Sequence, residues 1–444
     1  MPLDTQPVDV GRLLDDGRWS GYQRWLVALV AMTIVFDGID NQLLGIVIPT
    51  VMKEWGVARS AFAPVVALGY LGMMIGGLVA GLVGDRLGRR TALLGSMVVF
   101  GLMTILAAMV TGPAALGLLR LLAGIGLGGA MPNAAALAAE YVPLRKRPIA
   151  VTVTIVCVPL GGTLAGLLGI RLLPVLGWRM LFVYGGLVPL VAAFALRGLL
   201  PESPRFLARH EARWDELRAM LPRFGHAIST TATFVGGSAS SIARASLSAL
   251  FAPEWRRDTL ALWAAFFFCL FSVYLGFSWL TSLLTGAGFD PATANTGITA
   301  FNLGGVAGAL VGGFAIPRLG SRMAMLTMAG VAVAGAAVLS GMTISPAAGA
   351  VRLIAMLALT GGMINGVQTT MYALAAHVYP SAVRATGVGT AVAVGRFGAI
   401  LTGYVGPWAI ELRGTTSFFA VIAVTMVVTF VALASVKRHV VARG

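Results

Sequence analysis

Long apolar runs dominate the chain, and polar residues gather in short segments between them. A helix needs about 20 mainly apolar residues to cross the hydrocarbon core of a bilayer. The pattern predicts twelve such helices, over 24–50, 61–83, 91–110, 114–139, 148–170, 179–200, 258–284, 293–316, 323–343, 349–375, 384–408 and 414–436. We therefore expect an all-α polytopic membrane protein.

One long polar stretch, residues 201–257, divides these spans into two sets of six. We expect residues 1–200 to form an N-terminal six-helix bundle, 201–257 a cytoplasmic linker, and 258–444 a C-terminal six-helix bundle. Part of the linker, about 203–222, fits an amphipathic helix on the membrane surface. A solvated connector is the simpler interpretation.

The composition supports a membrane protein and argues against nucleic-acid binding. The chain is 11% charged and 58% hydrophobic, whereas a soluble domain is about 25% charged. Lys and Arg exceed Asp and Glu by 15, but they lie in short clusters between apolar runs rather than along one groove. Cys157 and Cys269 each lie inside an apolar run, so we expect neither a disulfide framework nor a metal cluster.

The placement of positive charges predicts the orientation. With both termini inside, 24 Lys and Arg fall in inner segments and six in outer segments. Because inner loops carry the positive excess, we expect both termini in the cytoplasm and the protein in the cell (inner) membrane. The first 22 residues show no signal-peptide pattern, which predicts that the first span is an uncleaved anchor.

The two halves resemble each other in sequence. Pro143 and Arg147 match Pro380 and Arg384 at an offset of 237 residues, after equivalent spans. The alternative to a duplication is a chance match between Gly- and Ala-rich segments, which explains the matching Pro and Arg residues less well. A parallel duplication predicts a binding site between two bundles at mid-membrane and rocking of one bundle against the other.

Several motifs resemble those of a known family. The loop Gly84–Arg90 resembles the signature loop of the major facilitator superfamily, and Pro201–Arg205 is shared by several of its branches. The segment Asp37–Asn41 (Asp-Gly-Ile-Asp-Asn) and the stretch Tyr379–Gly406 resemble the aromatic acid:proton symporters. The resemblance implies two six-helix bundles and import of a benzoate-type carboxylate, such as 4-hydroxybenzoate or protocatechuate. It does not indicate which acid.

The sequence departs from the family pattern in two places. The second signature loop has Pro317 where the first has Asp85. Relatives in this branch often carry a His near the loop between spans 8 and 9, where this chain has Ser321 and Arg322. A role of that His cannot be transferred to this protein.

Four ionisable residues lie inside predicted spans: Asp37, Asp40, Arg120 and Arg396. Each costs about 2.5–3.5 kcal/mol near a helix centre, so they are expected to face an interior cavity or one another. Asp37 and Asp40 are three residues apart and share a helix face with Asn41. Because neighbouring carboxylates repel in a poorly hydrated site, at least one should bind and release a proton. The alternative is that one acid only bonds backbone groups or pairs with an arginine.

The two arginines have different expected roles. Arg396 lies near the midplane in a Gly-rich run, where a guanidinium suits bidentate pairing with a substrate carboxylate. The alternative is a permanent salt bridge to the first span. By resemblance, Arg120 assists proton movement or pairs with the acids of the first span. The alternative is a purely packing and pairing role.

An aromatic ligand also needs apolar, stacking and hydroxyl-binding partners. Such side chains occur at the same expected depth, although each alone is more often packing than ligand contact. The candidates are Tyr70, Phe266, Tyr274, Phe301 and Phe397 for the ring, and Asn302, Asn365, Gln368 and Tyr372 for a hydroxyl group.

A second constellation is expected to gate the cytoplasmic side. Asp85 can accept from backbone N–H groups near 382–386, and Arg90 and Glu140 could form a salt bridge. By resemblance these contacts stabilise the outward-open state, whereas simple positive-inside anchoring explains the arginines but not Asp85. The gating set comprises Gly84, Asp85, Arg86, Gly88, Arg89, Arg90, Glu140, Arg147 and Arg384.

The leading hypothesis is a proton-coupled importer of a small aromatic carboxylate, which acts by alternating access. The alternatives are transport of another organic anion, such as a sugar acid or dicarboxylate, and proton-coupled export of drugs or organic ions. No nucleotide loop, metal-spaced His pair or nucleophile elbow supports an enzyme. The expected partners are the substrate, protons and the lipid bilayer; we expect a monomer, no nucleic acid and no cofactor other than the coupling proton.

Overall fold

The computed structural model describes residues 7–226, 228–229, 232–235, 247–380 and 383–442. Within these residues, ten helices are long and apolar enough to cross a membrane. They are α2 (Gly21–Trp55), α3 (Ala63–Leu87), α4 (Arg89–Ala107), α5 (Pro113–Tyr141), α6 (Arg147–Leu199), α9 (Arg256–Gly286), α10 (Pro291–Gly341), α11 (Ala350–Val378), α12 (Arg384–Arg413) and α13 (Thr415–Ser435).

Two of these helices each supply two spans. At 1.5 Å per residue, the 53 residues of α6 would extend about 80 Å, far beyond a hydrocarbon core of about 30 Å. The backbone leaves helical geometry at Gly177 in α6 and at Gly320 in α10, both with positive φ (74° and 79°). Glycine adopts this conformation without steric cost. The ten helices thus correspond to the twelve predicted spans, and the predicted fold class is confirmed.

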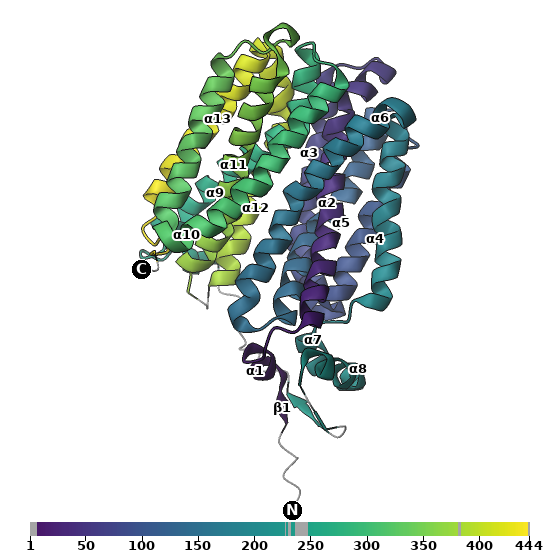
Figure 1. Cartoon of the computed structure of the whole chain (residues 1–444), viewed down its shortest axis with the longest axis vertical. Coiled ribbons are helices and arrows are strands. Elements are labelled where there is room, and N and C mark those ends of the chain that lie inside the picture. Colours follow the sequence, from purple (N-terminus) through teal and green to yellow (C-terminus); the bar gives the residue numbers. More distant parts are fainter. Residues whose placement is uncertain (1–6, 227, 230–231, 236–246, 381–382, 443–444) are drawn as a thin grey trace, which may run out of the picture.

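Helix packing follows the two halves of the chain. In the first half α2 packs on α6, and α5 packs on both α3 and α4. In the second half α9 packs on α12, and α10 packs on both α11 and α13. The halves meet through α6 with α10, α3 with α12, and α2 with α9 (Figure 1).

Specific residues define where helices begin and end. The Ser20 hydroxyl accepts from the Gln23 N–H, and the Gln23 side chain accepts from the Ser20 N–H, which forms a capping box before α2. The Asp290 side chain caps α10 by accepting from the backbone N–H groups of Ala292 and Thr293. Hydrogen bonds from the Thr293 hydroxyl and from backbone N–H groups lower the pKa of Asp290 below its usual value.

The first part of the predicted linker is folded onto the N-terminal half. The short elements on this side are β1 (Val8–Asp9), α1 (Val10–Asp15), α7 (Pro204–Ala208), α8 (Trp214–Met220) and β2 (Phe234–Val235). The strands β1 and β2 pair in parallel, and Leu217 and Leu221 are buried. Asp15 forms ion pairs with Arg147 and Arg205. This segment is therefore neither a simple solvated connector nor one amphipathic surface helix.

Both chain ends lie toward the lower end of the molecule in Figure 1, which we call the terminal face; the opposite end is the far face. The halves approach closely in the half of the molecule nearer the far face. A Cβ at Gly45 would overlap the carbonyl oxygen of Phe277, and one at Gly403 would lie 2.6 Å from the carbonyl oxygen of Ala63. Arg59, between α2 and α3, donates to Ser282 of α9 at 3.0 Å.

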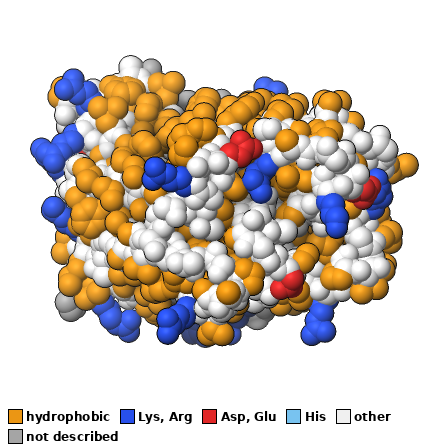
Figure 2. Space-filling model, turned by 90° about the horizontal axis from the view of Figure 1, so that it is seen from above, with side chains coloured by type: hydrophobic (Ala, Val, Ile, Leu, Met, Phe, Trp, Pro, Cys, Tyr) orange, Lys and Arg blue, Asp and Glu red, His pale blue; other side chains and the backbone are white. Residues whose placement is uncertain are grey.

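The outer surface is suited to a bilayer. Large apolar side chains such as Val191, Phe194 and Phe314 are exposed on the spans. Figure 2 looks onto the far face and shows hydrophobic side chains over much of the outline, with scattered charges of both signs.

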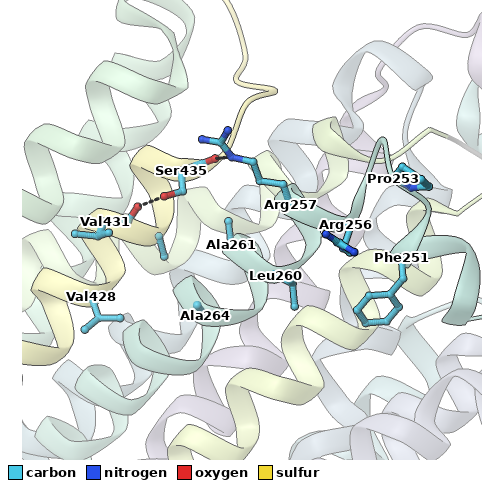
Figure 3. A pocket seen from close by; sticks show the side chains of 11 residues that line it. Phe251, Pro253, Arg256, Arg257, Leu260, Ala261, Ala264, Val428, Val431 and Ser435 are labelled. Atoms are coloured by element: carbon cyan, nitrogen blue, oxygen red, sulfur yellow. Dashed lines mark hydrogen bonds between the residues drawn. The ribbon is translucent and has the colours of Figure 1, made fainter.

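A groove of about 750 Å³ lies at the terminal face between the start of α9 and the end of α13 (Figure 3). Arg256, Arg257 and Ser435 lie at the helix ends, and Leu260 and Val431 lie one turn further into the bundle.

Candidate functional site

Asp40 and Arg120 form an ion pair inside the N-terminal half. Asp40 of α2 is completely buried, and its carboxylate lies 3.2 Å from the guanidinium of Arg120 on α5. The hydroxyl of Thr104 on α4 donates to the other carboxylate oxygen at 2.5 Å. The guanidinium also stacks over the ring of Phe182, 5.1 Å from its centroid. Both oxygens of Asp40 are therefore bonded, as expected for a charge that a membrane span must hold.

Asp37, one turn earlier on α2, has a different environment. Its side chain is 4% exposed, and its Oδ1 atom has no hydrogen-bond partner among the described residues. Asp37 lies close enough to Arg396 and Asp40 to interact electrostatically with both. Asp37 and Asp40 share a helix face as predicted, but only Asp40 has hydrogen-bond partners for both carboxylate oxygens.

Arg396 of α12 lies at the junction of the two halves. It donates to the hydroxyl of Tyr274 on α9 at 2.5 Å, and its guanidinium stacks 5.3 Å from the centroid of that ring. The same guanidinium contacts the sulfur atom of Met73 on α3, in the other half, at 3.5 Å. Its hydrogen-bonding partners here are neutral, so Arg396 has no direct carboxylate partner within the described residues.

Two tyrosines connect this arginine to the N-terminal half. The rings of Tyr70 and Tyr274 lie 4.7 Å apart, and the Tyr70 hydroxyl is 2.6 Å from the hydroxyl of Ser278. A small cavity of about 30 Å³ borders Asn41, Tyr70, Arg120 and Ser278. Ser278 was not predicted from the sequence, although it lies four residues after Tyr274 and so on the same helix face.

A buried amide pair crosses the junction nearby. Gln42 of α2 and Asn302 of α10 each donate to the other's carbonyl oxygen, at 2.7 and 2.9 Å. Asn302 was predicted as a hydroxyl partner for the ligand, but its amide is engaged by Gln42, which sequence analysis missed. Asn365 is buried and donates to the carbonyl of Gly361 in its own helix.

The remaining aromatic candidates divide into two groups. Phe266 packs edge-on against Tyr372, and Phe301 is buried against Gly276 and Gly361. Phe397 is 53% exposed, so its predicted place in the ligand site is wrong. It directly follows Arg396, and successive residues of a helix point about 100° apart.

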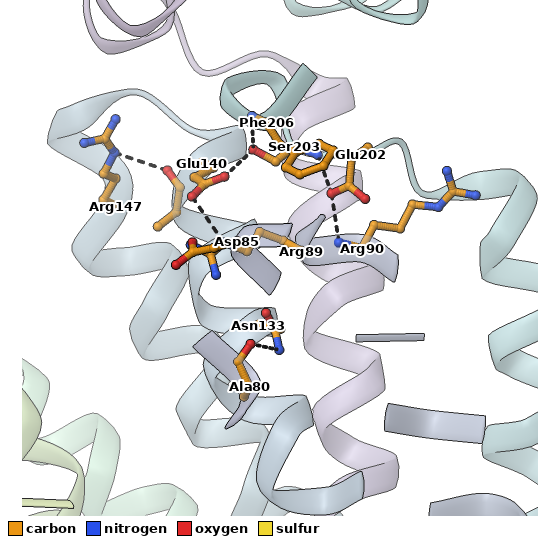
Figure 4. Close-up of polar contacts among 11 residues, drawn as sticks. Ala80, Asp85, Arg89, Arg90, Asn133, Glu140, Arg147, Glu202, Ser203 and Phe206 are labelled. Atoms are coloured by element: carbon orange, nitrogen blue, oxygen red, sulfur yellow. Dashed lines mark hydrogen bonds and ion pairs between the residues drawn. The ribbon is translucent and has the colours of Figure 1, made fainter. Parts of the chain in front are cut away.

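Several of the residues predicted to gate the cytoplasmic side belong to a polar network at the terminal face (Figure 4). Asp85 forms an ion pair with Arg89, whose Nε lies 3.8 Å from Glu140. The predicted salt bridge between Arg90 and Glu140 is wrong, because the Arg90 side chain donates to the carbonyl of Arg197. Arg86 is exposed.

Glu202 organises this network, although sequence analysis assigned it no role. It is buried and accepts from the backbone N–H groups of Arg90 at 2.9 Å and Thr91 at 3.3 Å, at the start of α4. Gly88 has φ 98°, and a Cβ there would overlap the Glu202 carboxylate. A Cβ at Gly84 would likewise overlap the side chain of Asn133. These two glycines are therefore required sterically.

The repeat-related arginines make similar contacts. Arg147 donates to the carbonyl of Ala139, and Arg384 to the carbonyl of Tyr379, both at 3.2 Å. The predicted latch between Asp85 and the backbone N–H groups near 382–386 includes residue 382, which lies outside the described residues. It stays a prediction.

A family model, Major Facilitator Superfamily, matches residues 30–347. The chain belongs to this superfamily. The gallate transporter of Pseudomonas putida is 35% identical over 95% of both chains. The 4-hydroxybenzoate transporter of Acinetobacter baylyi is also 35% identical, over 95% of this chain and 92% of the relative.

Solved structures agree on the fold. The xylose transporter of E. coli, in a partially occluded inward-open conformation, has a TM-score of 0.70 at 15% identity, covering 93% of this chain and 98% of that one. The curated relatives match the aromatic acid:proton symporter family indicated by the motifs, and that prediction is confirmed. This major facilitator is a transporter and not an enzyme.

Proposed function

We propose that this transporter imports a small aromatic carboxylate of the hydroxybenzoate or benzoate type together with a proton, by alternating access. The observation that carries the proposal is the position of Arg396. Its guanidinium lies at the junction of the halves, against a tyrosine ring and near an acid that keeps one oxygen unbonded. The relatives named as gallate, 4-hydroxybenzoate and benzoate transporters support this substrate class.

Arg396 is the carboxylate-binding group in this proposal. A guanidinium offers a planar pair of donors that matches a carboxylate. The substrate carboxylate would replace the Tyr274 hydroxyl as its acceptor, and the rings of Tyr70 and Tyr274 would then border the substrate ring. A dicarboxylate would need a second free cation, whereas Arg120 is already paired with Asp40.

Asp37 is the proton carrier in this proposal. Both carboxylate oxygens of Asp40 already accept a hydrogen bond, one from Thr104 and one from Arg120. Asp37 has an unbonded oxygen in a buried site, which leaves a place for a proton. Because a monoanion and a proton enter together, the charge of the site does not change over the cycle.

The proposal also includes an orientation in the membrane and a domain organisation. Both termini would lie in the cytoplasm of a cell whose inner membrane holds the protein as a monomer. Residues 1–200 and 258–444 would be the rocking bundles, joined by 201–257. Close packing nearer the far face then corresponds to an inward-facing state.

The function is tested by uptake into proteoliposomes. Labelled 4-hydroxybenzoate, gallate and benzoate are expected to accumulate when the outside is acidic and to stop accumulating when a protonophore is added. Shikimate and succinate serve as non-aromatic carboxylates. Undiminished accumulation under the protonophore would refute symport, and preference for the non-aromatic acids would refute the substrate class.

Gly45→Ala is expected to reduce uptake about tenfold or more, because overpacking costs about 1–3 kcal/mol and here opposes closure of α2 on α9. A methyl group at position 45 would overlap the carbonyl oxygen of Phe277. Gly21→Ala in the same helix is the matched control, because a Cβ there meets nothing within 4 Å. Uptake is measured for both variants, and equal rates would contradict the role of this contact.

A further inference from the structure

The groove between α9 and α13 is amphipathic along its length. Arg256 and Arg257 are exposed at the first residues of α9, beside Ser435 at the end of α13. Further in, Leu260, Ala264 and Val428 supply an apolar wall (Figure 3). The groove thus begins with two positive charges at the terminal face and continues as hydrocarbon-lined surface.

The two arginines keep unused hydrogen-bonding capacity. Within the described residues, Arg256 has no side-chain partner, and Arg257 uses only its Nε, which donates to the carbonyl of Ser435 at 3.0 Å. The acid of the same turn, Asp258, is buried and turned to the C-terminal tail. It accepts from the Lys437 N–H at 2.7 Å and pairs with Arg438 at 3.7 Å.

The nearby acid Glu254 does not neutralise these arginines either. Its carboxylate accepts from the indole of Trp255 at 2.7 Å, and neither arginine forms a described ion pair with it. The Arg438 guanidinium stacks on that same indole at 3.7 Å, which adds a third cation to this corner of the molecule. The mouth of the groove is therefore net positive.

The depth of the groove matches the position of a lipid. Eight residues separate Arg256 from Ala264, which corresponds to about 12 Å along the helix. On α13, Val431 and Val428 lie one and two turns before Ser435. Leu260 and Val431 are half exposed, on helices long and apolar enough to span the membrane.

We propose that this groove binds an anionic phospholipid of the leaflet at the terminal face. The phosphate lies between the guanidinium groups of Arg256 and Arg257, and an acyl chain lies along Leu260, Ala264 and Val428. Basic pockets between membrane helices select anionic headgroups in this way. The site lies outside the junction of the halves, and its existence does not depend on the transported substrate.

Native mass spectrometry of the full-length protein in detergent tests the site. Phosphatidylglycerol is expected to bind on the order of tenfold more tightly than phosphatidylcholine, and the double variant Arg256→Gln/Arg257→Gln to lose that preference. The matched control Arg318→Gln/Arg322→Gln removes the same charge from exposed positions of the same half. This control is expected to keep the preference for phosphatidylglycerol. An unchanged preference in the first double variant would overturn the proposal.

A second pair of measurements separates a lipid from a free phosphate. Ala264→Phe fills the apolar wall but leaves both arginines, so it is expected to weaken phosphatidylglycerol binding. Glycerol 3-phosphate, which has the headgroup chemistry without acyl chains, is expected not to displace the lipid. Full binding by Ala264→Phe, or displacement by glycerol 3-phosphate at equal concentration, would show a phosphate site and overturn the lipid assignment.

Discussion

Asp37→Asn is expected to abolish gradient-driven accumulation of substrate while leaving exchange of labelled for unlabelled substrate intact. Asparagine keeps the shape of the side chain but cannot carry a proton. Exchange needs only binding and movement of the loaded protein, whereas net symport needs the proton to bind and leave. Both are measured in the same proteoliposomes, with and without an imposed pH gradient.

Asp40→Asn is the matched comparison, three residues away on the same helix. It leaves Arg120 buried without its counter-charge, and breaking a buried ion pair in this way costs about 3–5 kcal/mol. We therefore expect a lower thermal unfolding midpoint for Asp40→Asn and little change for Asp37→Asn. The opposite result would assign the proton to Asp40 instead. In that case Asp37→Asn would still accumulate substrate, and Asp40→Asn would be stable but would not accumulate it.

Arg396→Ala is expected to weaken binding of every carboxylate substrate. Truncating one partner of a buried charge pair costs about 2–5 kcal/mol, or roughly 30-fold to several thousand-fold in Kd. Arg396→Lys keeps the charge but loses the planar pair of donors, so an intermediate loss is expected. Binding is measured by displacement of labelled 4-hydroxybenzoate.

Two controls distinguish a carboxylate-binding role from a structural one. Tyr274→Phe removes the present acceptor of Arg396 but keeps the ring, and it is expected to weaken binding much less. 4-Hydroxybenzyl alcohol has the same ring without the charge, so wild type and Arg396→Ala should bind it equally weakly. Loss of affinity for the alcohol as large as that for the acid would show that Arg396 only holds the fold.

The sequence predicted the features that depend on local pattern or on the cost of charge in a membrane. Apolar runs predicted the spans because a helix must be long and apolar enough to cross the bilayer. The same cost predicted that Asp40 and Arg120 face each other or a cavity, and the structure places them 3.2 Å apart.

The features that sequence analysis missed depend on neighbouring helices. Asp37 and Asp40 are equivalent in the sequence and differ in the structure because Thr104 and Arg120 lie beside only one of them. The sequence could not show whether Arg89 or Arg90 pairs with Glu140. The choice depends on Glu202, which binds the backbone at the start of α4. The orientation of Phe397, in contrast, was accessible from its position next to Arg396.

The amide pair of Gln42 and Asn302 has a consequence for how the transporter responds to acidity. Neither amide gains or loses a proton in the physiological range, and the pair satisfies itself by two reciprocal bonds. This contact between the halves therefore has the same strength on the acidic and the alkaline side of an energised membrane. In the proposed mechanism the proton gradient acts on Asp37, so this contact between the halves and the proton-binding residue can change independently.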